Sequence, residues 1–134
     1  MLTKEQHIAF WLESAQDDWE TALVLMNNKR YGFCLFSLHL VIEKLLKAIW
    51  IKESLTNTPP FTHDLIKLCE ESNLALSLED LDFLVAINSW NIRGRYPDYS
   101  KSLHQSATPA YLFIQIEKVQ KLKKWLEEKI SMMK

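Results

Sequence analysis

The chain of 134 residues has little of what builds turns, since it contains only two glycines and four prolines. So few turn residues favour long helices joined by few connections over many short strands. The length suits one domain with a substantial core and is too short for two. We therefore expect a single domain over residues 1–134.

An excess of charge of one sign is also missing. Lysine and arginine number 16 against 17 aspartates and glutamates, which leaves a formal net charge of −1. No global electrostatic field would recruit nucleic acid, although a local basic patch is compatible with this balance. The lysines of the last predicted helix are typical of a solvated face, with weak nucleic-acid binding as the alternative.

Cysteine is scarce, and several chemical signatures are missing. Cys34 and Cys69 form no CxxC pair and lie in apolar helical settings, which is typical of buried reduced thiols. We find no metal-ligand spacing, no Ser-His-Asp order and no glycine-rich phosphate loop, so neither a metal nor a cofactor is expected. The first eight residues contain Lys4, Glu5 and His7 and lack the apolar core of a signal peptide, so a cytoplasmic protein is expected.

The most apolar stretch is Tyr31–Ile51, in which 15 of 21 residues are apolar or aromatic. Its uncharged part, Tyr31–Ile42, is too short to cross a membrane. On a helix, His39, Glu43 and Lys47 fall on one stripe, where Glu43 would pair with Lys47 and with His39. We interpret the stretch as the central helix of a bundle, with apolar surface left over for a second copy and hence a homodimer.

Apolar residues that recur every three or four positions predict about five helices, and the expected fold is an all-α, up-and-down bundle. The expected ranges are 4–27, 31–54, 63–72, 78–93 and 109–131. Thr3 starts a capping box, Thr62 is expected to cap the third helix, and Gly94 followed by Pro97 to end the fourth. On the fourth helix, Leu81, Leu84, Val85 and Asn88 are assigned to the inner face.

Two polar stretches are candidates for chemistry. In Asn88–Tyr99, arginine forks suit phosphate and tyrosine faces suit a base or ribose. Alternatively, these arginines pair with acids such as Asp98 and the tyrosines pack the helix end. His63-Asp64 could transfer a proton or contact phosphate, or could serve only as a helix-start turn that satisfies free amides. For both stretches the residues by themselves favour the structural explanation.

Four short motifs occur in an order that resembles the HEPN domain family, and together they cover nearly the whole chain. They are Ala15 and Ala22 on an early helix, Tyr31-Gly32 leading to Glu43-Lys44 and Leu46-Lys47-Ala48, Thr62-His63-Asp64-Leu65 after a proline loop, and Arg95-Tyr96-Pro97-Asp98. The resemblance implies a helical bundle, commonly a homodimer. Members are often encoded beside a minimal nucleotidyltransferase as a toxin–antitoxin-like pair.

Many members of that family are metal-independent RNases with an arginine, four to six intervening residues and a histidine. Here eight residues separate Arg95 from His104, so the usual spacing is missing and the chain looks more like the Arg-Tyr-Pro branch. The resemblance thus implies a module that binds a nucleotide, RNA or a protein partner, with ligand-binding candidates Asn88, Asn91, Arg93, Arg95, Tyr96 and Lys47. The alternative is an RNase that uses Arg95 with His104 or His63.

Overall fold

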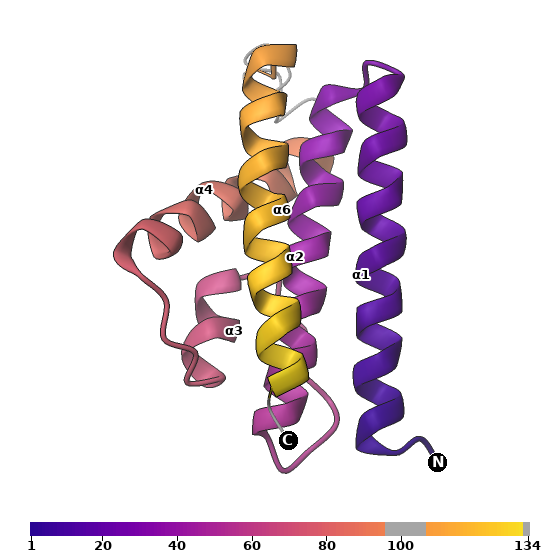
Figure 1. The fold of residues 1–134 in the computed structure, drawn as a ribbon, viewed down its shortest axis with the longest axis vertical. Helices are drawn as coiled ribbons and strands as arrows, with labels where there is room; N and C mark the ends of the chain where they lie inside the picture. Colours follow the sequence, from indigo (N-terminus) through magenta and orange to yellow (C-terminus); the bar gives the residue numbers. More distant parts are fainter. Residues whose placement is uncertain (96–106, 133–134) are drawn as a thin grey trace.

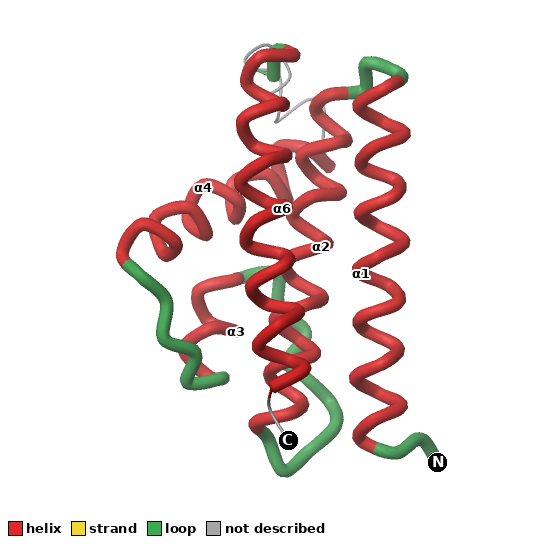
Figure 2. The backbone as a smooth tube through the Cα atoms, viewed as in Figure 1, coloured by secondary structure: helices red, strands yellow, loops and turns green. Residues whose placement is uncertain are grey.

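The computed structural model describes the backbone of residues 1–95 and 107–132 and the side chains of residues 1–91 and 107–131. Within these ranges the chain forms five helices and no strand, which confirms the all-α prediction (Figures 1 and 2). The helices are α1 (Lys4–Asn27), α2 (Tyr31–Glu53), α3 (Leu65–Glu71), α4 (Leu78–Arg95) and α6 (Pro109–Met132). None of the described helices is long and apolar enough to cross a membrane.

Helices α1 and α2 form an antiparallel pair (Figure 1). The predicted capping box is present, because the Thr3 hydroxyl accepts from the Gln6 amide and the Gln6 side chain accepts from the Thr3 amide. The turn between the helices contains Lys29 in the left-handed region, with a φ of 61°. At the far end of α2, the Lys4 ammonium donates to the carbonyls of Ile51 and Ser54, at 2.6 and 2.8 Å.

The centre of the fold is α2, which packs against α1, α3, α4 and α6. Most of its apolar residues are buried within one chain, and only Phe33 and Glu53 on this helix are exposed. The apolar circumference of α2 is therefore explained by its four neighbouring helices. Phe33, at 40% exposed, is the apolar residue of α2 that remains most open, and the homodimer stays a prediction.

Helix α6 lies along α2, while α4 crosses at an angle and α3 is a short segment beside them (Figure 1). The apolar spacing of α6 predicts an inner stripe of six residues. Five are buried, and Ile116 is half-buried against the core; the buried members are Leu112, Val119, Leu122, Leu126 and Ile130. On α4 the buried face is Phe83, Leu84, Ile87 and Trp90. Val85, predicted on the inner face, is instead 60% exposed, because α4 presents the neighbouring positions to the core.

Two helix ends differ from the sequence-based prediction. Helix α3 begins at Leu65 with Asp64 as its cap, because the Asp64 carboxylate accepts from the Ile66 amide at 3.0 Å. The Thr62 hydroxyl instead accepts from the Asp64 amide and shapes the turn before the helix. Helix α4 passes through Gly94 and continues to Arg95, because glycine weakens a helix only by about 1 kcal/mol and does not stop it.

Candidate functional site

The polar stripe of α2, made of His39, Glu43 and Lys47, lies inside the protein. The exposed fractions of these residues are 0%, 3% and 7%. The Lys47 ammonium donates to Glu43 Oε2 at 3.1 Å, which confirms the ion pair predicted from their spacing. Buried charges require partners, so the contacts of this stripe decide what it can do.

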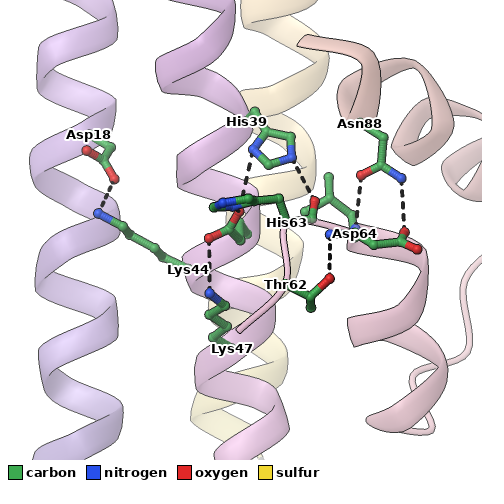
Figure 3. Close-up of polar contacts among 10 residues, drawn as sticks. Asp18, His39, Lys44, Lys47, Thr62, His63, Asp64 and Asn88 are labelled. Carbon is green, nitrogen blue, oxygen red and sulfur yellow. Dashed lines mark hydrogen bonds and ion pairs between the residues drawn. The ribbon is translucent and has the colours of Figure 1, made fainter. Parts of the chain in front are cut away.

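The segment before α3 covers the polar stripe. His63 Nδ1 donates to Glu43 Oε1 at 2.7 Å, and His39 Nε2 donates to the backbone carbonyl of His63 at 3.1 Å (Figure 3). His63 thus contacts the stripe through both its ring and its backbone. Glu43 stands at the centre, with one carboxylate oxygen on His63 and the other on Lys47.

His39 is held in its neutral form. Its Nε2 carries the hydrogen that a carbonyl requires, so Nδ1 is unprotonated and lies 3.7 Å from Glu43 Oε1 without a hydrogen-bond partner. Burial lowers the pKa of His39 to about 4, and the opposing effect of the nearby Glu43 carboxylate is smaller. Neutral His39 therefore fixes the backbone at His63 through its hydrogen bond to the His63 carbonyl.

His63 differs from His39 in its access to solvent, since half of its side chain is exposed. Because Glu43 accepts the hydrogen on Nδ1, Nε2 of the neutral ring is left to accept a proton or a hydrogen bond. A carboxylate that fixes the tautomer and orientation of an imidazole is a common arrangement for proton transfer. Among the described histidines, His63 has both a carboxylate that orients its ring and a side chain that is open to solvent.

Helix α4 is tied to the same segment through Asn88. The Asn88 carbonyl accepts from the Leu65 amide at 2.9 Å, and its amide donates to the Asp64 carboxylate at 3.1 Å (Figure 3). Both ends of the Asn88 side chain are thus used within the chain. Seven residues later on α4 is Arg95, so its backbone lies on the same helix face about 10 Å further along.

The other predicted site residues are distributed unevenly. Asn91 is buried, and its Nδ2 has no hydrogen-bond partner in the described part of the chain. Lys47 lies with its ammonium 5.2 Å from the centre of the Trp11 ring and 3.1 Å from Glu43 Oε2, so its charge is already paired within the chain. The side chains of Arg93 and Arg95, and all of Tyr96 and His104, lie outside the described residues.

Sequence reasoning missed Glu43 as the residue that organises the site. It noted Glu43 as a partner of Lys47 and treated His63 separately, although 20 residues separate Glu43 from His63 and the two are in direct contact. The available signal was that both belong to motifs shared with one family. Cys34 and Cys69 are free and buried, as predicted, and burial raises the pKa of the Cys34 thiol to about 12.

The fold and this site describe an all-α domain whose central helix carries a buried acid covered by a histidine. Residues 8–129 match the profile of the HEPN domain. The match covers most of the chain, and the protein belongs to the HEPN domain family, which suggests a nucleotide- or RNA-related function. No curated protein and no solved structure matches the chain.

Proposed function

We propose that this HEPN domain binds the phosphate of a nucleotide or RNA where the His63 ring meets the face of α4 that carries Asn88. The observation behind this proposal is the 2.7 Å contact between buried Glu43 and the half-exposed ring of His63. A buried carboxylate is a costly way to hold a surface ring, because a buried charge loses its hydration and needs directed partners. A buried acid that orients an exposed imidazole therefore favours a functional site.

Arg93 and Arg95 are proposed to supply the main phosphate contacts. Both lie in the last turn of α4, and the Asn88 hydrogen bonds fix this helix to the segment that carries His63. The planar fork of arginine suits two oxygens of one phosphate. Tyr96, the next residue, is proposed as a flat wall for a base or ribose.

The test is the affinity for a labelled single-stranded RNA hexamer, measured at several salt concentrations. Arg95→Ala should weaken binding and lower the magnitude of the salt slope by about 0.7, the value for one contact to a single strand. Ser89→Ala is the matched control, because this exposed residue precedes the site on α4. Failure of the wild type to bind the hexamer at low salt would contradict the proposal.

The partners that the family resemblance implies are part of the same proposal. We propose that the domain acts with a minimal nucleotidyltransferase in a toxin–antitoxin-like pair and that it forms a homodimer. Exposed apolar side chains that could serve such contacts lie on four helices: Phe10 and Val24 on α1, Phe33 on α2, Val85 on α4, and Phe113 and Ile114 on α6. Light scattering that finds a monomer at high micromolar concentration would contradict the homodimer.

Metal-independent RNA cleavage is the second candidate function, and the same Glu43–His63 contact supports it. In this alternative Arg95 would stabilise the phosphate and His63, oriented by Glu43, would move the proton. His104 is the other candidate for proton transfer and lies outside the described residues. General acid–base help of this kind contributes about 10²–10⁴-fold in rate.

Incubation of the protein with mixed RNA in EDTA separates the two functions. The binding module predicts no cleavage by the wild type. Cleavage that is lost in His63→Gln and kept in His104→Ala would instead establish an RNase that uses His63. The reverse pattern would assign proton transfer to His104.

A further inference from the structure

A small hollow lies beside the polar stripe, between the start of α1 and the loop that precedes α3. Its volume is about 220 Å³, and the residues that matter for its chemistry are Phe10, Trp11, Lys47, Asn57 and Phe61. We call this feature the aromatic hollow. It is smaller than the roughly 300–1,000 Å³ of sites that enclose a whole small molecule, so it can take one ring of a ligand whose remainder lies outside.

Two of the aromatic rings that line the aromatic hollow are open to solvent. Phe61 is fully exposed, and Phe10 is 56% exposed. Phe10 also meets Trp11 edge-to-face, with ring centres 5.4 Å apart, which orients both rings. Exposed, oriented aromatic rings around a gap of this size suit a flat ring that can stack on them.

The lining also contains polar groups with unused hydrogen-bonding capacity. Asn57 Oδ1 is buried and has no hydrogen-bond partner in the described ranges, an arrangement that is costly unless a donor arrives. The Lys47 ammonium has three N–H groups, and among described residues it donates one hydrogen bond, to Glu43. A ring that carries a donor and an acceptor on one edge would satisfy both groups.

The aromatic hollow and the proposed phosphate site share one carboxylate. Glu43 Oε2 binds Lys47, which lines the hollow, and Glu43 Oε1 binds His63, which faces the proposed phosphate. Both hydrogen bonds are short, at 3.1 and 2.7 Å, so the two features are neighbours. A ligand with a ring in the hollow would extend naturally past His63.

We propose that the aromatic hollow is a base subsite, in which one base of a nucleotide or single-stranded RNA stacks on Phe61 and Phe10. The edge of the base donates to Asn57 and accepts from Lys47, as the Watson–Crick edge of each nucleobase can. The ribose phosphate then leads toward His63. This inference rests on the proposed function and adds to it the position of the base.

The experiment compares two probes of equal charge by fluorescence anisotropy: an oligoadenylate hexamer and an abasic phosphodiester hexamer. Stacking of one base should make the oligoadenylate bind about 5- to 150-fold more tightly. Phe61→Ala should remove most of this preference and leave binding of the abasic probe unchanged. Because Phe61 is fully exposed, this substitution should not affect folding.

Two further variants test whether the preference for the oligoadenylate over the abasic probe arises in the aromatic hollow. Asn57→Ala should weaken oligoadenylate binding and leave the abasic probe unaffected. Leu55→Ala is the matched control, because Leu55 is a fully exposed apolar residue that precedes the same loop and does not line the hollow. Its preference for the oligoadenylate should equal that of the wild type.

The two probes distinguish failure of the base subsite from failure of the proposed phosphate binding. Equal binding of both probes by the wild type, or an unchanged preference in Phe61→Ala, would overturn the base subsite and leave phosphate binding standing. Absence of binding to either probe would contradict both the base subsite and the proposed function.

Discussion

Helix α2 buries both an apolar surface and a pair of charged residues, and the two are stabilised in different ways. Leu45, Leu46 and Ile49 are at most 1% exposed and touch the apolar core. Glu43 and Lys47, on the same helix, are 3% and 7% exposed and carry charge. The apolar residues gain free energy from burial alone, at about 25 cal/mol per Å², whereas the charged pair loses hydration and needs directed partners.

This difference bears on the role of the polar stripe, because core stability does not account for its buried charges. Replacement of a buried ion pair by apolar residues of similar volume is often neutral or stabilising, so a helix that served only as a core would not need this pair. The stripe also makes specific contacts with His63, a residue at the surface. Burial therefore has a different consequence on the two surfaces, since the apolar one stabilises the fold and the polar one holds His63 against α2.

The largest effect is expected for Glu43→Ala. This change leaves the Lys47 ammonium buried without its counter-charge and should lower the free energy of unfolding by about 3–5 kcal/mol, measured by urea denaturation. The double variant Glu43→Leu/Lys47→Met is the control, and it should recover most of the loss. A double variant as unstable as the single one would show that the carboxylate itself, rather than the unpaired charge, is what the fold requires.

Leu46→Ala tests the apolar surface. Removal of a fully buried leucine side chain should cost about 2–5 kcal/mol of unfolding free energy, again by urea denaturation. At a temperature where the variant remains folded, its RNA affinity should match that of the wild type. A clear loss of RNA affinity in the folded variant would contradict the claim that the apolar surface of α2 contributes to stability and not to binding.

The acid dependence of stability tests the polar stripe further. The pKa of His39 is about 4 when folded, whereas a histidine in the unfolded chain titrates near 6.5. Between these values the unfolded state binds the extra proton, so lowering the pH from about 6.5 toward 4 should remove up to about 3 kcal/mol. His39→Gln should show a shallower loss over this range in denaturant titrations, and an equally steep loss would contradict the assignment.

Asn88→Ala should have the smallest effect. It removes two hydrogen bonds that join α4 to the segment before α3, worth about 1–2 kcal/mol together. Amide hydrogen exchange at Leu65 should accelerate, because that N–H loses its acceptor. Ser89→Ala should leave exchange at Leu65 unchanged, and acceleration in both variants would point to general loosening of α4.

Much of the fold follows from short-range patterns in the chain. The capping box at Thr3 and the bounds of α1 and α2 agree with the prediction to within a residue, because caps and helical periodicity act over a few positions. The start of α3 was wrong, since Thr62 and Asp64 can both act as caps and only the folded loop selects Asp64. Val85 was wrong because the tilt of α4 decides which of two adjacent apolar residues faces the core.

In the candidate site, too, some contacts follow from the sequence and others depend on tertiary packing. The spacing of Glu43 and Lys47 predicts their ion pair, because the helix alone brings residues four apart together. The contact between Glu43 and His63 depends on how the proline-containing loop returns to α2. No spacing rule reaches across that loop, and the same holds for the aromatic hollow, which joins α1 to it.

The sequence by itself determined an all-α chain, the extents of its long helices and the identity of the stripe on α2. These depend on interactions between near neighbours, which any chain with these residues would form. Only the tertiary structure decided that the stripe is buried, that His63 covers it and that aromatic rings open beside it. Such contacts join residues far apart in sequence, and packing around α2 sets their distances.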